Sequence, residues 1–318
     1  MKPDLFLADL LEKPARLRGL DLDDAWGFVA PPAQVLLLGM GSSHYANLVA
    51  AARLRAGGVP VVAELASSDL LPAVSPDTLV IAVSASAGSV ETLDAVDRVG
   101  MPFVAVANKE GPLTERAART VWMQAGEERG GVACRSFQHT LALLLALEAH
   151  LIGGPLPPIA LAAEASEDLL ARAGDWRPRL AELLLGPQGT HVVAPAHRIS
   201  SAYQCALMLR EGPRLPAVGC ETGDWSHVDV YLTKTTDYRM LLLGGSRWEQ
   251  QLLEWTDQRG STVVGVGADV PGATETLRYA HDDVDDVRLL TETLISELLA
   301  AHAWLDADQA GQASRPGG

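Results

Sequence analysis

The chain contains 318 residues, with 40 acidic and 25 basic side chains and a formal net charge of −15. This acidic balance disfavours a nucleic-acid partner or an anionic membrane surface, because both are bound through basic patches. The length suits two domains, and 48% apolar residues are enough to give each of them a hydrophobic core.

The cysteines, Cys134, Cys205 and Cys220, stand far apart, and no pair has the CxxC spacing. They match neither a disulfide framework nor a zinc site, so we expect reduced thiols and a cytoplasmic protein without a metal. The N-terminus has no secretory signal pattern, and no apolar run approaches the roughly 18 residues that span a bilayer.

Taken in chain order, the sequence predicts an N-terminal helical segment over 1–30, with an amphipathic helix at 4–22. Short apolar runs bounded by Gly or Pro then predict strands buried on both faces. These strands are expected at Val35–Leu38, 59–64, Leu79–Val83, Phe103–Ala107 and Val121–Gln124. Helical patterns follow Gly39–Ser43 and cover 90–98 and 136–152. The alternation predicts a doubly wound parallel sheet, which makes 31–152 the first domain.

Gly153-Gly-Pro-Leu-Pro-Pro158 predicts a linker, which runs with the following helix through 153–175. The second domain is expected over 176–305, and 306–318 is expected to be a disordered tail. Its strands are expected at His191–Ala194, Met240–Leu243 and Val263–Val266, and its helices over 199–211 and 288–304.

The two halves resemble each other in the order and spacing of their elements. A shift of 157 residues places Ser43 on Ser200 and Glu64 on Glu221, although identities are few. The sequence therefore predicts an α/β protein with two doubly wound, flavodoxin-type parallel sheets that are related by internal duplication.

Two segments of the first domain carry a chemical signal. Gly39-Met-Gly-Ser-Ser43 follows the first predicted strand, and Ser84-Ala-Ser-Ala-Gly-Ser89 follows the third. Such turns offer hydroxyls and backbone N–H groups at the positive end of a helix dipole, so they can bind a phosphate without Lys or Arg. The alternative is that these residues only cap helices. The first segment lacks both the dinucleotide fingerprint and the Walker pattern, and we predict no cofactor.

These segments, together with Glu64 and the run Leu79–Thr92, resemble a sugar-isomerase (SIS) domain. From about residue 30 to about 300 the chain is similar to the isomerase half of glucosamine-6-phosphate synthase, which has two tandem SIS domains; the glutaminase half has no counterpart. The resemblance implies a sugar phosphate as ligand, held by Ser84, Ser86 and Ser89, with Ser43 beside it. It also shows departures, because Ala85 and Ala87 stand where the family has Gln and Gly.

The segment Ala206-Leu-Met-Leu-Arg-Glu211 resembles the family's Ala-Leu-Lys-Leu-Lys-Glu motif. This implies that Glu211 moves a proton between C1 and C2 of the open-chain sugar. His227, sixteen residues later, has the spacing of the family's ring-opening histidine, which the neighbouring subunit supplies; a homodimer is therefore implied. A carboxylate shuttle and a histidine that titrates near neutral pH suit this chemistry. The alternatives are a surface glutamate at a helix end and a capping or packing histidine.

Other family positions have changed. Met208 and Arg210 replace two lysines, and no lysine follows Lys234, so a Schiff-base step lacks its nucleophile on this chain. The stretch 125–135 resembles a family segment in which the counterparts of Ala133 and Arg135 are Ser and Lys. Gly244-Gly-Ser246 is a degenerate second copy of the serine loop, and we expect no phosphate there.

The sequence favours a phosphosugar isomerase of the aldose–ketose type, acting on a hexose or amino-sugar phosphate through an enediol. Two alternatives stay open. The missing lysines favour a non-catalytic sugar-phosphate sensor, and a deaminase or deglycase of an amino- or glycated-sugar phosphate is related chemistry. The sequence names neither the sugar nor the direction of the reaction.

Overall fold

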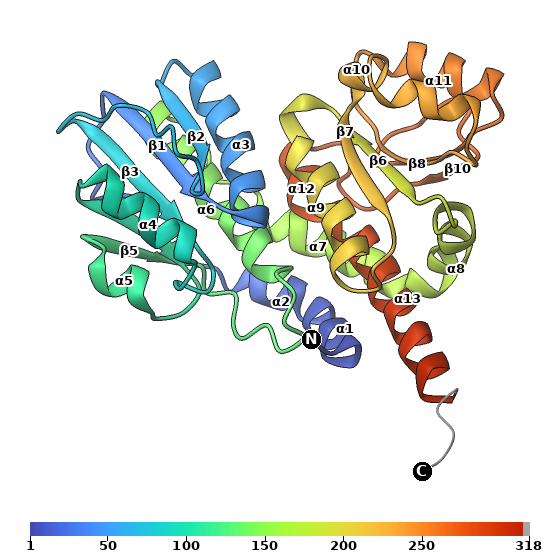
Figure 1. Ribbon diagram of the computed structural model, residues 1–318, viewed down its shortest axis with the longest axis horizontal. Helices are drawn as coiled ribbons and strands as arrows, with labels where there is room; N and C mark the ends of the chain where they lie inside the picture. The colour runs from blue at the N-terminus through green and yellow to red at the C-terminus, as the bar shows by residue number, and fades with distance from the viewer. Residues whose placement is uncertain (314–318) are drawn as a thin grey trace. The chain divides into compact units, whose positions relative to one another are not determined.

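The computed structural model describes residues 1–313, which fold into two compact units, each with its own parallel sheet (Figure 1). The first-sheet unit contains residues 16–127 and 135–158. The second-sheet unit contains 1–15, 128–134 and the chain from 159 onward.

The first-sheet unit has five parallel strands in the order β2-β1-β3-β4-β5. The strands are β1 (Gln34–Gly39), β2 (Val61–Leu65), β3 (Thr78–Val83), β4 (Phe103–Ala107) and β5 (Arg119–Trp122). The helices that follow them are α3 (Gly41–Ala56), α4 (Val90–Val99), α5 (Pro112–Arg116) and α6 (Arg135–Ile152). Because strand side chains alternate between faces, Leu36 and Leu38 pack towards α4 and α5, while α3 and α6 pack together on the other side (Figure 1).

The second-sheet unit repeats this topology, since its strand order β7-β6-β8-β9-β10 is the same path through the sheet. Its strands are β6 (Thr190–Ala194), β7 (Ala217–Glu221), β8 (Arg239–Leu243), β9 (Thr262–Val266) and β10 (Glu275–Leu277). Met240 and Leu242 pack under Trp225 and Leu252 of the helices α10 and α11, as Leu36 and Leu38 pack under α4 and α5. The predicted fold class, two doubly wound parallel sheets of one topology, is confirmed.

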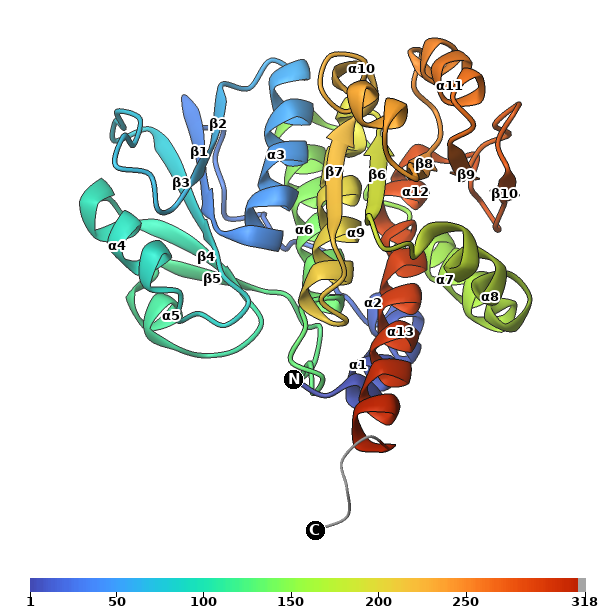
Figure 2. The same cartoon turned by 45° about the vertical axis from the view of Figure 1, so that its right-hand side comes forward.

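Helices complete the second-sheet unit. They are α1 (Pro3–Leu11), α2 (Lys13–Arg18, which continues into the first-sheet unit), α7 (Ile159–Ala171), α8 (Ala173–Leu184), η1 (Ala196–Arg198), α9 (Ile199–Glu211), α10 (Thr222–Trp225), η2 (Asp229–Lys234), α11 (Glu249–Gln258), α12 (Asp285–Thr291) and α13 (Thr293–Ala313). Figure 2 shows α7 beside α8 and α1 beside α13, in agreement with their contacts.

Three expectations differ from the structure. Residues 306–313 are not a disordered tail but the last turns of α13, and 314–318 lie outside the described residues. The helix expected at 4–22 is two short helices, because Pro14 has no N–H to continue α1. The contiguous domain limits also differ from the compact units. Residues 1–15 and 128–134 pack with the second sheet, and Phe6 lies 6.3 Å from Trp304 of α13 between ring centroids.

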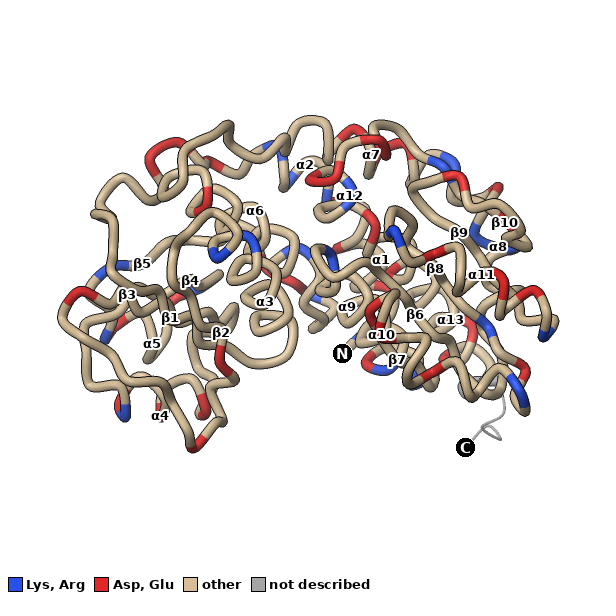
Figure 3. The backbone as a smooth tube through the Cα atoms, turned by 90° about the horizontal axis from the view of Figure 1, so that it is seen from above, with Lys and Arg blue, Asp and Glu red and all other residues tan. Residues whose placement is uncertain are grey.

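Within the described residues, no helix combines the length and the apolar character that a membrane crossing requires. Figure 3 shows that Lys and Arg are interspersed with Asp and Glu along the chain of both units.

Candidate functional site

The two serine-containing turns of the first-sheet unit emerge next to each other. Strands β1 and β3 pair in parallel, with Gly39 opposite Val83, so the segments Gly39–Ser43 and Ser84–Ser89 begin at the same sheet edge. The chain passes to opposite sides of the sheet at these two strands, which is where doubly wound folds form a ligand crevice.

The turn after β3 is closed by its own side chains. The hydroxyl of Ser84 lies 3.5 Å from that of Ser86, and the Gly88 N–H donates to Ser86 Oγ at 3.3 Å. Ser84 is buried and Ser86 is exposed, so a ligand above the turn would meet Ser86 first. Ala87 has a φ of 52°, the left-handed region in which the resemblance places a glycine. An alanine there costs about 1 kcal/mol, which makes this turn more constrained than a glycine turn.

The contacts of Ser89 fit a residue that only caps a helix as well as they fit a phosphate-binding residue. Its hydroxyl accepts from the Thr92 N–H at 3.3 Å as the N-cap of α4, and donates to Glu91 at 2.9 Å. A backbone hydrogen bond at the helix start is the main cause that lowers the pKa of Glu91, and the bond from Ser89 adds to it, so a negative charge already lies beside Ser89. A phosphate on this serine would compete with that carboxylate.

The turn after β1 is more open. Within residues 1–313, no side chain makes a capping hydrogen bond to α3, whose N-cap is Met40. Gly41 has a φ of 50°, and a Cβ placed on it would meet no atom of the described chain within 4 Å. Ser43 is half-buried in the first turn of α3. The Ser43 N–H already donates to the Met40 carbonyl at 3.1 Å. The start of α3 therefore offers an anion the positive end of the helix dipole and the open space beside Gly41.

Glu211 is the last residue of α9 in the second-sheet unit, and its side chain is half-buried. Burial raises the pKa of its carboxyl above the usual 4.5, and the nearby charge of Glu128 raises it further. A carboxyl group with a raised pKa can both take and return a proton, which is what an acid–base group needs. Met208, one turn earlier, is fully buried and offers no amine.

His227 lies elsewhere on the same unit. It is exposed just after α10, where its backbone N–H donates to the Asp224 carbonyl at 2.8 Å, and its side chain lines a pocket of about 460 Å³ with Glu221 and Trp248. Among the described residues, no hydrogen bond or ion pair joins His227 to Glu211. The structure therefore does not bring the two predicted acid–base residues into contact within one chain.

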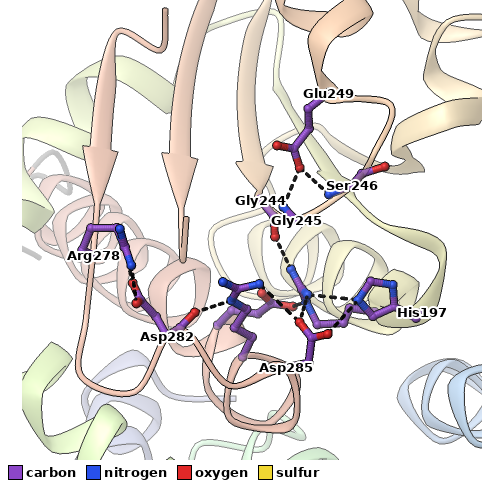
Figure 4. A network of polar contacts seen from close by, with 11 residues as sticks. His197, Gly244, Gly245, Ser246, Glu249, Arg278, Asp282 and Asp285 are labelled. Carbon is purple, nitrogen blue, oxygen red and sulfur yellow. Dashed lines mark hydrogen bonds and ion pairs between the residues drawn. The ribbon is translucent and has the colours of Figure 1, made fainter. Parts of the chain in front are cut away.

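The matching crevice of the second-sheet unit is filled by its own charges (Figure 4). After β8, the Glu249 carboxylate accepts from the N–H groups of Gly245 and Ser246 at 2.5 and 2.6 Å. After β6, the buried Arg198 donates to the Gly244 carbonyl and to Asp285, the latter at 2.9 Å. This geometry supports the expectation that no phosphate binds at Gly244–Ser246.

Glu128 and Arg198 were missed as functional candidates by the sequence reasoning. Glu128 lies in the stretch 125–135 that resembles the family, and this was the one signal that could have marked it. Arg198 occupies the place of Gly41 when the first half is shifted by 157 residues. The replacement of a glycine by an arginine at matching positions of the two halves was the signal that could have marked it.

Comparison with known proteins gives these sites a context. Residues 29–149 match the SIS domain family. The chain is 30% identical over 245 residues to the isomerizing glutamine–fructose-6-phosphate aminotransferase of Aeropyrum pernix, covering 71% of this chain and 38% of that protein. It is 24% identical to that of Leifsonia xyli subsp. xyli, covering 87% of this chain and 50% of that protein. The chain thus spans half or less of the length of these relatives.

Solved structures share the fold over nearly the whole chain. The C-terminal domain of glucosamine-fructose-6-phosphate aminotransferase from Francisella tularensis has a TM-score of 0.77 at 16% identity, covering 95% of each chain. Tagatose-6-phosphate ketose/aldose isomerase from Escherichia coli has a TM-score of 0.77 at 16% identity, covering 95% of this chain and 93% of that one. Glucosamine-6-phosphate deaminase from Thermotoga maritima has 0.73 at 17%, covering 95% of each.

Two parallel sheets of one strand order, with serine-containing turns at one edge of the first, define the α/β architecture that the chain shares with these solved structures. Residues 29–149 form an SIS domain, and the chain is homologous to the isomerase half of glutamine–fructose-6-phosphate aminotransferase.

Proposed function

We propose that this protein is an aldose–ketose isomerase of a hexose or amino-sugar phosphate. The observation that carries the proposal is the half-buried Glu211, whose pKa is raised, in a chain homologous to sugar-phosphate enzymes. Ser43, Ser84, Ser86 and Ser89 hold the phosphate in this proposal, through hydroxyls and helix N-termini and without a cation.

Glu211 performs the chemical step. Its carboxylate takes the proton from the hydroxyl-bearing carbon next to the carbonyl, the proton of that hydroxyl passes to the carbonyl oxygen, and an enediolate forms. The protonated Glu211 then returns the proton to the neighbouring carbon, which leaves the carbonyl group moved by one position. His227 assists opening of the sugar ring.

We also propose that the protein works as a homodimer. Exposed apolar side chains gather near His227, on η2 and at the start of α11: Val228, Tyr231, Leu232 and Trp248 are 40–61% exposed. An apolar group of this kind beside a candidate catalytic histidine suits an interface through which a partner subunit receives that histidine. Size-exclusion chromatography with light scattering tests this, and a monomer at assay concentration would contradict it.

Isomerisation is tested by deuterium exchange. The protein is incubated with fructose 6-phosphate and a panel of other phosphosugars in D2O, and deuterium at C1 or C2 is followed by NMR. We expect exchange with the wild type, its loss in E211Q, and no change in the control E254Q, which alters an exposed glutamate of α11.

The pH dependence follows from the direction of the Glu211 pKa. Glu211 acts as a base in its deprotonated form, so the exchange rate falls as the pH drops through a midpoint that lies above 4.5.

The same experiments separate the alternative functions. Binding of a phosphosugar without deuterium exchange, across the whole panel, would contradict the isomerase and favour a sugar-phosphate sensor. Release of ammonia from an amino-sugar phosphate would instead favour the deaminase.

A further inference from the structure

A pocket of about 670 Å³ lies in the first-sheet unit, at the edge where the strands begin. Its lining includes the first residues of β3, β4 and β5 and the segment 28–33, which leads into β1. The serine turns start from the opposite edge, where β1 and β3 end. The pocket is therefore separate from the crevice of the proposed function.

The wall of the pocket that precedes β1 is fixed to α6. Trp26 Nε1 donates to the Leu143 carbonyl at 2.8 Å. The Val29 carbonyl accepts from His150 Nε2 at 2.7 Å. Phe28 lies between these two ties, and its ring is 6.2 Å from that of Trp26 between centroids and 44% exposed. The pocket is thus formed by the fold itself, as ligand pockets usually are.

The floor of the pocket is apolar. Arg119 of β5 stands opposite Val104 of β4, and Val104 stands opposite Ile81 of β3. Leu79, two positions before Ile81, points to the same face of the sheet, because side chains alternate along a strand. The Arg119 side chain therefore stands at the end of a floor to which Leu79 and Val104 contribute.

The backbone of the lining offers a ligand few hydrogen-bond donors. Four lining residues are prolines, which have no N–H: Pro31, Pro32, Pro76 and Pro102. Three further N–H groups of the lining already donate to backbone carbonyls, those of Ala33, Thr78 and Ala118. The guanidinium of Arg119 is left as the cationic donor of the pocket.

Arg119 is held by stacking rather than by an acid. Its Cζ lies 5.8 Å from the centroid of the Phe28 ring, and its side chain makes no hydrogen bond or ion pair within residues 1–313. Stacking uses a face of the guanidinium and leaves the N–H groups on its edge for a carboxylate. The acid of the lining, Asp77, is four residues before Ile81, about 13 Å along the strand direction and two strands away. Asp77 therefore does not neutralise this cation.

We propose that this pocket binds an aromatic monocarboxylate, whose carboxylate pairs with the edge of Arg119 and whose ring lies against Leu79, Val104 and Phe28. One cation balances one negative charge, whereas a phosphate dianion would keep an uncompensated charge beside an apolar floor. The exposed Phe28 ring suits a second ring beside it. The inference goes beyond the proposed function, because both the ligand and the edge of the sheet are different.

The test measures binding of 2-naphthoate to the full chain by isothermal titration calorimetry and locates it by shifts of backbone amide NMR signals. We expect shifts in 28–33 and at the starts of β3, β4 and β5. R119M keeps an apolar side chain without the charge, so the affinity should fall about ten-fold. The matched control is R116M, an exposed arginine of α5 that pairs with Asp97 outside the lining, and it should leave the affinity unchanged.

A neutral isostere tests the charge from the side of the ligand. 2-Naphthalenemethanol has the same rings without the carboxylate, so it should bind the wild type about ten-fold more weakly than 2-naphthoate. Its affinity should be the same in R119M as in the wild type. F28A covers a failure of R119M to fold, since it removes the stacked ring, keeps the charge, and should weaken 2-naphthoate by about three- to ten-fold.

Three results would overturn the inference. The first is no binding of 2-naphthoate at millimolar concentration, or binding with signal shifts elsewhere. The second is an unchanged affinity in R119M, or in F28A if R119M does not fold, or an alcohol that binds as tightly as the acid. The third is a dimer that R119M dissociates, because a second copy of the chain would then cover the pocket.

The inference and the proposed function fail independently. R119M should leave the affinity for fructose 6-phosphate unchanged, and S84A should leave the affinity for 2-naphthoate unchanged, because the two sites lie at opposite edges of the sheet. Loss of 2-naphthoate binding in S84A would contradict a separate site.

Discussion

The two sheets of this protein have the same strand order but differ at the edge where a ligand would bind. After β1, Gly41 leaves the turn open, whereas the corresponding place after β6 is taken by Arg198, which is 1% exposed. Arg198 joins both turns of its crevice to α12 and the residue after it, through Gly244, Asp285 and Glu292 (Figure 4). One crevice is open at its first turn, and the other is sealed by an internal cation.

The turns after β3 and β8, the third strand of each sheet in chain order, also differ in whether they leave room for an anion. In the first, a neutral hydroxyl, Ser86 Oγ, accepts the loop N–H of Gly88. In the second, the Glu249 carboxylate accepts two loop N–H groups, where an incoming anion would have to bind. The comparison teaches that topology places the crevice, while one or two side chains decide whether an anion can enter it.

The largest expected effect concerns the sealed crevice. R198M leaves Glu292, which is fully buried, without its cation, and we expect the free energy of unfolding to fall by about 3–5 kcal/mol at neutral pH. Burial raises the pKa of Glu292, so the carboxyl becomes neutral as pH falls and the loss shrinks towards acidic pH. Urea denaturation at several pH values measures this. The exposed Arg210 provides a control, since R210M should change the free energy of unfolding little. An equal loss of stability in both variants would contradict the stabilising role of Arg198 in this crevice.

The second prediction concerns the open crevice. S84A and S86A each remove a hydroxyl that we expect to bind phosphate, and each should weaken fructose 6-phosphate binding by about 10- to 100-fold. Isothermal titration calorimetry measures the affinity. S246A, in the corresponding turn of the sealed crevice, should leave it unchanged. Equal weakening by S246A would remove the distinction between the two turns.

The smallest expected effect concerns Glu91, the carboxylate beside Ser89. E91Q removes a negative charge at the open crevice and replaces the carboxylate that accepts from Ser89 with a weaker, neutral acceptor, so phosphosugar binding should tighten by about two- to five-fold. The gain should shrink at high salt, because exposed charges are screened. E115Q, which alters an exposed glutamate of α5, is the control. Weaker binding in E91Q would mean that Glu91 supports the ligand rather than opposing it.

Much of the fold was predictable because its strands are buried on both faces. Runs such as Val35–Leu38 and Met240–Leu243 are continuous in apolar residues, and they appear as β1 and β8. β7 was not predicted as a strand, because its sequence Ala-Val-Gly-Cys-Glu has no such run and Val218 is 49% exposed. β10 has only three residues, too few to show a period.

By itself, the sequence determined the alternation of strands and helices, the repeat, and the serine turns, since these follow from local patterns of apolar, glycine and hydroxyl residues. The tertiary structure decided which charges meet. Residues 128–134 meet α1 and α9 only in the folded chain, where the Gly130 N–H donates to Asp9 and Gln204 donates to the Ala133 carbonyl. Arg198 meets Glu292 across 94 positions of the chain. Such contacts depend on the packing of distant segments, and a buried charge gains its partner, and its altered pKa, only when that packing is complete.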